Sequence, residues 1–446
     1  MAKKFFIIIL LILAGLVGYQ TYQKFHNSNN TNQFTEITTT TQTNLTEIED
    51  LINTHQYQKA QENLKTLLQI NTTNQEALFL SSKIYLLREK NDLAEKFLEA
   101  LKKLKADSKQ IAHIQFLLQY QRGQYQLALK TLQKSQIPEK KFYEGILRLL
   151  QDDIVGGRNI LLNIQGQAYQ SLSQQILNDI SLFETYQDAN LGFLHAKIGK
   201  SLKNNQEVIL AKKFLLKAVS NQNQFRDAWL YLGHIYLETQ KYADAIKVFE
   251  KAKQMSPYYA ETHLMLGSTY YFLKQYDRAI KYLENAISFK TQQTAKASEY
   301  LGLSYYAQGQ NTKAISQFNK SHQAQTLDLD SYASYIYLLS EQADTKKLNS
   351  IIQRLQKAYP QKAMSYNLQG WIKLIQKDFS SAKKFLNLAL KKDPHLAAAF
   401  LNLGQISLAE EKNDLATTYF QKAAMYAKQK NEISIYNKAN ELLQTL

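Results

Sequence analysis

The chain has 446 residues, 45% of them hydrophobic, and contains only four prolines and fifteen glycines. Because proline and glycine disfavour helix interiors, their scarcity favours an almost wholly helical chain. There is no cysteine, which excludes disulfides, thiolate nucleophiles, cysteine-ligated zinc sites and a lipid-bearing N-terminal cysteine. The formal net charge is +16, a surplus that attracts polyanions such as nucleic acid or anionic lipid.

The chain begins with a short basic segment, residues 1–4, followed by an unbroken apolar run from Phe5 to Gly18. Extended through the aromatic residues that follow it, the run reaches the 17–25 residues or so that a membrane-spanning helix needs. We interpret residues 5–25 as a transmembrane anchor. The alternative is a signal peptide, but Leu16 stands where a cleavage site would need a small residue.

The distribution of basic residues around this segment predicts its orientation. Two lysines precede the apolar run, and after it Lys24 is the only lysine or arginine before Lys59. Because basic residues stay on the cytoplasmic side, we expect residues 1–4 in the cytoplasm and everything after residue 25 on the extracytoplasmic side. If the segment is instead a cleaved signal peptide, the chain is exported.

Residues 26–40 are rich in Asn and Thr and lack apolar periodicity, which is typical of a flexible linker. From residue 41 to residue 170, apolar residues recur at helical spacing in weakly repeated helix pairs, beginning near Thr41, Gln75 and Lys109. A fourth, distorted pair is predicted at 142–164. We expect residues 171–191 to form an irregular helical insert that marks a bend.

The clearest pattern in the chain runs from Arg226 to Pro257. With Arg226 as position 1, positions 4, 7, 8 and 11 form one stripe along a first helix, and positions 20, 24 and 27 form a matching stripe on a second. A proline at position 32 fits the connection that follows. The residues concerned are Trp229, Leu232, Gly233, Tyr236, Ala245, Phe249, Ala252 and Pro257.

This spacing resembles the tetratricopeptide repeat, a 34-residue unit with the signature W-x2-L-G-x2-Y, A-x3-F and P. Units in the same register begin near residues 192, 226, 260, 295, 329, 363 and 397. They make 192–430 a C-terminal array, 41–170 a set of degenerate repeats and 431–446 a capping helix. We therefore predict an all-α chain: an α-solenoid of about ten or eleven tetratricopeptide hairpins, each needing neighbours to bury its faces, with an N-terminal transmembrane helix.

Three features that suggest chemistry have simpler explanations. Gly199-Lys200-Ser201 ends like a phosphate-binding loop, but Leu194 stands where that loop needs glycine. Asp152-Asp153 has no His or Glu at ligand spacing, which favours a solvated turn. The eight histidines are scattered and form no H-E-x-x-H pair. We therefore expect no enzymatic activity, no metal and no cofactor.

Positions 2, 5, 9 and 12 of the first helices form a second stripe, and the resemblance implies that this stripe lines a concave surface where peptides bind. A well-known subgroup holds a terminal carboxylate with Lys at position 5 and Asn at position 9, and the mapped units lack both. The alternative is that these side chains pack against adjacent repeats. The candidate groove residues are Leu230, His234, Tyr271, Leu303, Tyr306, Tyr337, Asn367, Trp371 and Gln405.

The resemblance implies a non-enzymatic scaffold or adaptor that binds protein or peptide partners. Bacterial membrane-anchored proteins of this kind commonly assist assembly of pili, secretion systems or polysaccharide export machinery. We therefore expect a membrane-tethered scaffold at the outer face of the cytoplasmic membrane. The alternative is a soluble nucleic-acid or polyanion binder that uses lysines on the outer helices, including Lys247, Lys281 and Lys384.

Overall fold

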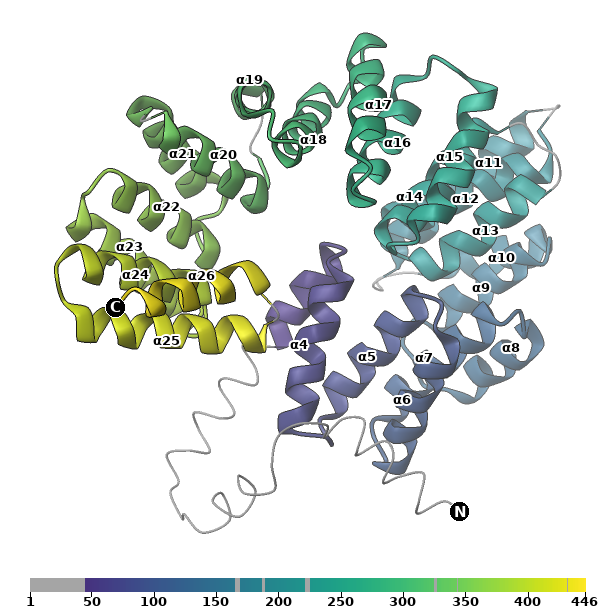
Figure 1. Cartoon of the computed structure of the whole chain (residues 1–446). Coiled ribbons are helices and arrows are strands. Elements are labelled where there is room, and N and C mark those ends of the chain that lie inside the picture. Colours follow the sequence, from purple (N-terminus) through teal and green to yellow (C-terminus); the bar gives the residue numbers. More distant parts are fainter. Residues whose placement is uncertain are drawn as a thin grey trace. The chain divides into compact units, whose positions relative to one another are not determined.

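The computed structural model describes residues 45–164, 169–186, 189–220, 225–324, 327–342, 344–430 and 432–446. All regular secondary structure in these ranges is helical, without strands, and the helices stack as a solenoid of hairpins (Figure 1). This confirms the all-α solenoid of the predicted fold class. The predicted anchor at 5–25 and linker at 26–40 lie outside the described residues. None of the described helices combines the length and apolar character needed to cross a membrane.

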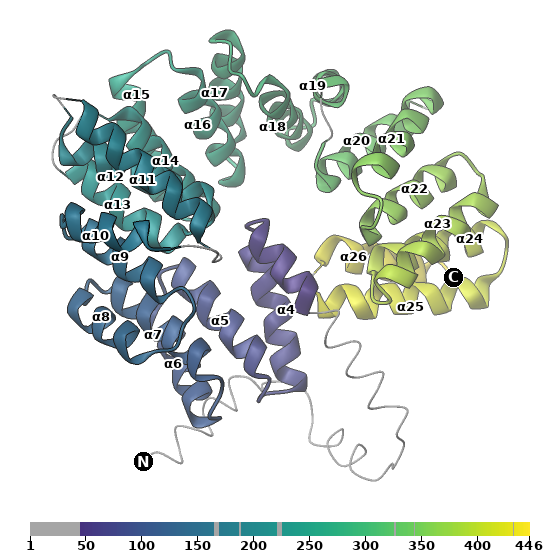
Figure 2. The ribbon, with the colours of Figure 1, turned by 180° about the vertical axis from the view of Figure 1, so that it is seen from behind.

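The chain divides into two compact units, Met1–Met255 and Ser256–Leu446. In the first, residues 45–53 form a helix that precedes α4, and α11 is a single helix between two hairpins. Both views show these elements stacked in chain order (Figure 2). The helices of this unit are α4 Tyr57–Ile70, α5 Gln75–Leu87, α6 Asn91–Lys103, α7 Ser108–Gln121, α8 Tyr125–Lys134, α9 Lys140–Leu150, α10 Ile154–Leu162, α11 Gln170–Thr185, α12 Leu191–Asn204, α13 Val208–Ser220, α14 Arg226–Glu238 and α15 Tyr242–Met255.

The second unit contains five hairpins and a closing helix in its described residues. Its first helices begin where the sequence pattern places position 1, or one residue before. They are paired as α16 Ala260–Phe272 with α17 Tyr276–Ser288, α18 Thr294–Ala307 with α19 Asn311–Ala324, α20 Leu329–Glu341 with α21 Thr345–Ala358, α22 Ala363–Ile375 with α23 Phe379–Lys392, and α24 Ala397–Ala409 with α25 Asn413–Gln429, followed by α26 Ile433–Gln444.

Glycine at position 8 sets the close approach of the two helices in a hairpin. A Cβ added to Gly233 would lie 2.3 Å from the fully buried ring of Phe249, and one added to Gly404 would lie 2.4 Å from Phe420. Ordinary contact between carbon atoms needs about 3.5–4.0 Å. The pair of position 8 and position 24 therefore fixes the spacing of the hairpins that carry glycine at position 8.

The turn inside a hairpin also repeats. The residue that follows the C-cap of the first helix adopts a left-handed conformation with positive φ, a common way to end a helix. Glycine fits this position without strain, but most hairpins here place a longer side chain at it. The described examples include His55, Glu89, Gly123, Asp152, Gln206, Gln240, Lys274, Gly309, Lys377 and Glu411.

Candidate functional site

Aromatic side chains gather on the first helices of three successive hairpins in the second unit. The Tyr271 ring of α16 lies 5.4 Å from the Phe272 ring and 5.6 Å from the Tyr300 ring of α18. The Tyr306 ring of α18 lies 6.2 Å from the Tyr337 ring of α20 in an edge-on arrangement. We call these five residues the aromatic stripe.

The aromatic stripe remains open to solvent in part. Phe272 and Tyr337 are 42% and 44% exposed, and the other three residues are half-buried. Burial raises the pKa of Tyr271 to about 12 and also raises the pKa of Tyr306, so both phenols stay neutral at physiological pH. Neutral, half-buried tyrosines present an apolar ring together with a hydrogen-bonding hydroxyl, a combination that suits peptide recognition.

The charged groups beside the aromatic stripe are paired, with one lysine between two carboxylates. Lys296 Nζ lies 5.0 Å from the centre of the Tyr300 ring, 3.0 Å from Glu299 and 2.8 Å from Asp328. Glu299 is almost fully buried and also accepts a hydrogen bond from the backbone N–H of Asp328 at 2.9 Å. Burial opposes the charged form of Lys296, but Tyr300, Glu299 and Asp328 together raise its pKa. This network ties α18 to the start of α20 and leaves the stripe mainly apolar.

The other predicted groove residues of the second unit differ in how far they are buried. Leu303, Trp371 and Gln405 are half-buried on first helices. Asn367 is buried, and its Oδ1 accepts a hydrogen bond from Nδ2 of Asn402 at 3.0 Å. Asn367 therefore links α22 to α24, as the alternative of packing between repeats expects.

In the first unit, the two predicted groove residues are packed within the fold. Leu230 is buried. The His234 ring lies 6.2 Å from the Phe249 ring, and burial, reinforced by Lys203 and opposed by Glu238, lowers its pKa to about 4. The His234 side chain is half-buried and neutral, so it offers a partner no charge.

Two members of the stripe, Phe272 and Tyr300, were not among the predicted groove residues. They occupy positions 13 and 6 of their units, outside the 2-5-9-12 pattern, so helical periodicity alone could not select them. The signal that could have found them is the local density of aromatic residues: Tyr270-Tyr271-Phe272 on one first helix, and three further tyrosines between residues 300 and 306 on the next.

The remaining chemical candidates have structural roles. Asp153 caps α10 by accepting a hydrogen bond from the Gly156 N–H at 2.9 Å, and it pairs with Arg148. Gly199 is a packing glycine, since an added Cβ would lie 2.7 Å from Leu215. Within the described ranges, no group of three or more His, Asp and Glu side chains is arranged to hold a metal ion.

A cavity of about 270 Å³ lies between α10 and α11 in the first unit. Its described lining consists of aliphatic, glutamine and serine side chains and includes no titratable group. It therefore offers no acid or base that could activate the serine hydroxyl.

Comparison with known families decides the nature of the repeats. Models of the tetratricopeptide repeat match residues 51–115, 225–292 and 264–327. The chain contains tetratricopeptide repeats. This confirms the predicted repeat identity both in the weakly patterned N-terminal region and in the array that starts near residue 226. Tetratricopeptide arrays are protein-interaction scaffolds, typically without enzymatic activity.

No curated protein matches the sequence. Solved structures similar to this chain include the APC/C hetero-tetramer Cut9–Hcn1, at 13% identity over 88% of this chain and 95% of that chain, with a TM-score of 0.43. Yeast Tom70 is 15% identical over 90% of this chain and 95% of that chain, with a TM-score of 0.36. PilW, described as a widely conserved type IV pilus biogenesis factor, is 16% identical over 55% of this chain and 98% of that chain, with a TM-score of 0.34. None of these three likenesses bears on function.

Proposed function

We propose that this tetratricopeptide protein is a membrane-tethered scaffold that captures a partner through the aromatic stripe of α16, α18 and α20. The observation that carries the proposal is the row of five aromatic side chains, each partly open to solvent, on three successive first helices. In binding interfaces a few aromatic anchors supply most of the energy. Since neighbouring charges are paired internally, the partner that fits is an amphipathic helix or an extended apolar peptide.

The membrane tether is part of the proposal and rests on the sequence. Lys3 and Lys4 precede the apolar run, and the chain beyond residue 25 is long and otherwise uninterrupted by apolar spans of that kind. We propose that residues 5–25 anchor the repeats on the extracytoplasmic side of a bacterial cytoplasmic membrane. In that place the scaffold would hold components of an envelope assembly, such as a pilus, a secretion system or a polysaccharide exporter.

The test is capture of partners from the native membrane by the full chain and by a variant with Tyr306→Ala and Tyr337→Ala. Loss of two anchors should weaken capture by about 2 kcal/mol, or about 30-fold. The matched control is Tyr258→Ala, since Tyr258 is 77% exposed and lies in the same unit outside the stripe. Equal capture by the double variant and the control would refute the proposed site.

A further inference from the structure

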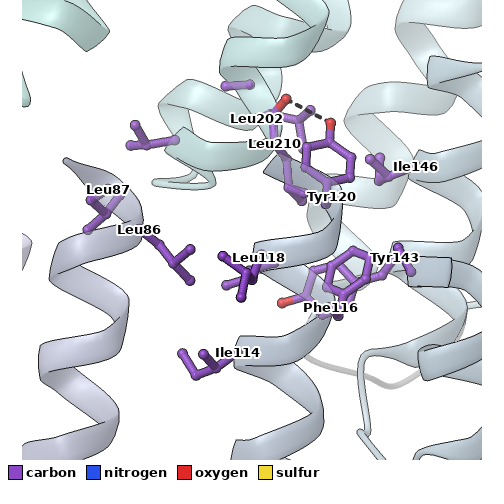
Figure 3. Packing of buried hydrophobic residues seen from close by; sticks show 14 of the residues in the cluster. Leu86, Leu87, Ile114, Phe116, Leu118, Tyr120, Tyr143, Ile146, Leu202 and Leu210 are labelled. Carbon is purple, nitrogen blue, oxygen red and sulfur yellow. Dashed lines mark hydrogen bonds between the residues drawn. The ribbon is translucent and has the colours of Figure 1, made fainter. Parts of the chain in front are cut away.

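In the first unit, helix α13 of a later repeat covers part of the stripe formed by positions 2, 5, 9 and 12 on the first helices of two earlier repeats. Tyr120 occupies position 12 of the unit that begins near Lys109, and Leu86 occupies position 12 of the unit that begins at Gln75. Both are fully buried. Tyr120 Oη donates a hydrogen bond to the carbonyl oxygen of Leu210 in α13 at 3.1 Å (Figure 3), and α13 packs against both α5 and α7.

Charged groups hold α13 in this place. The carboxylate of Glu89, in the turn after α5, pairs with Lys212 of α13 and lies 2.6 Å from Lys241 Nζ at the start of α15. Lys212 Nζ also lies 4.3 Å above the Tyr236 ring. The three charged side chains are 30%, 15% and 26% exposed, so solvent screens them less than it screens an exposed surface pair.

A second carboxylate repeats the arrangement. Asp152, in the turn after α9, lies 2.6 Å from Lys217 Nζ of α13, and the same ammonium group donates to the carbonyl of Leu150 at 2.7 Å. Two turns from separate early hairpins therefore each bind a lysine of one later helix.

Glu89 and Asp152 occupy an unfavourable backbone position. Their φ values of 57° and 66° lie in the left-handed region that costs about 1–2 kcal/mol for a residue with a side chain. Each also places a negative charge at the C-terminal end of a helix, where the dipole favours cations. An acidic residue is tolerated at the same position after α24, where Glu411 stands. At Glu89 and Asp152 the pairs with lysines of α13, and for Asp152 also a 3.0 Å contact with His195 Nε2, offset the cost.

The contact borders a solvent-open cleft of about 190 Å³ between α13 and the turn that joins α5 to α6. Residues that line the cleft include Leu87, Glu89, Lys212 and Leu216. Water can therefore reach the partly exposed pair of Glu89 and Lys212. An ion-paired contact at the edge of solvent separates more readily than a fully buried core.

We propose that the first-helix face of α5 and α7 is a second peptide-binding face, kept occupied by α13 and exposed when Glu89 and Asp152 release their lysines. The ligand that fits is chemically like α13 itself: an amphipathic helix whose aliphatic side covers Leu86 and Tyr120 and whose lysines bind the two carboxylates. This site goes beyond the proposed function, since it lies in the other unit and selects basic rather than purely apolar helices.

Opening can be measured in the full chain, which has no native cysteine. Spin labels on Lys96→Cys and Lys247→Cys, both exposed, report the separation of α6 from α15. We expect one narrow distance distribution in the parent and a longer, broader one after Lys212→Glu with Lys217→Glu, which breaks both pairs with α13. Adding Glu89→Lys and Asp152→Lys to that variant should restore the narrow distribution. Lys130→Glu with Lys134→Glu, at exposed positions of α8, makes the same change in net charge and should alter nothing.

Exposure of the face is then tested with a fluorescent synthetic peptide of residues 205–219. The peptide should bind the Lys212→Glu, Lys217→Glu variant at least about tenfold more tightly than the parent. Replacing the peptide's own lysines at 212 and 217 by glutamate should abolish binding. Equal binding to parent and variant, or an unchanged distance distribution, would overturn the proposal. So would a loss of helical circular dichroism in the variant that the added Glu89→Lys and Asp152→Lys restore, because the contact would then be a permanent part of the core.

Discussion

Replacing Gly233 by alanine tests whether the pair of positions 8 and 24 sets the hairpin spacing. An added Cβ would lie 2.3, 2.6 and 2.7 Å from three atoms of the Phe249 ring, and that ring is fully buried. The ring or one helix must therefore move by about 1 Å to restore ordinary contact. Overpacking of this kind costs about 1–3 kcal/mol, whereas alanine gains about 1 kcal/mol over glycine in a helix. We expect a net loss of up to about 2 kcal/mol.

The assay is hydrogen exchange along the chain combined with thermal unfolding. Because each repeat contacts mainly its neighbours, faster exchange should be concentrated in α14, α15 and the adjoining α12–α13 hairpin. Gly302→Ala is the matched control: it occupies the same repeat position, but its added Cβ would approach Phe318 only to 2.9 Å, so the loss should be smaller. An increase in stability at Gly233→Ala, as helix propensity alone predicts, would refute the packing argument.

Three further predictions concern acidity, ionic strength and topology. Burial lowers the pKa of both His113 and His234 to about 4, against 6.5 in the unfolded chain, so the unfolded state takes up protons first as pH falls. The free energy of unfolding of the first unit should therefore fall between pH 6.5 and 5, by up to about 2 kcal/mol for each histidine. In denaturation experiments at several pH values, His234→Gln should remove the part of this fall that is due to His234. Capture of the partner through the aromatic stripe should change little when salt is raised from about 0.05 to 0.5 M, because the contacts of the stripe are mainly apolar. If capture is lost in moderate salt while the Tyr337→Ala variant still binds, the partner binds the basic outer face instead. Protease added to intact spheroplasts should digest the repeats, and full protection until lysis would contradict an extracytoplasmic location.

Local pattern was enough to predict the hairpins. The helix starts at Arg226, Ala260 and Leu329 coincide with position 1 of the sequence pattern, because the positions that pack one helix against its partner lie within a single unit. The same reasoning reached the weak N-terminal repeats, and the family comparison confirms those at 51–115.

Contacts between distant repeats could not be predicted from the pattern within a unit. Nothing in the sequence around Tyr120 indicates that a helix 90 residues later will cover it, since the spacing of a unit carries no information about its non-neighbours. Asn367 is a different case, because its partner Asn402 lies in the adjacent repeat, and packing between adjacent repeats was the alternative for the groove candidates. The surface available to a partner therefore depends on how repeats meet, which only the structure shows.

Site-specific photo-crosslinking tests most directly the claim that the aromatic stripe receives a partner. A benzoylphenylalanine residue placed at Tyr337, on the stripe, is compared with one placed at Tyr258, which is more exposed but lies outside it. In living cells we predict discrete crosslinked products from position 337 that are lost when Tyr306→Ala is added, and none of those products from position 258. Products that form equally from both positions, or from 258 alone, would contradict the account.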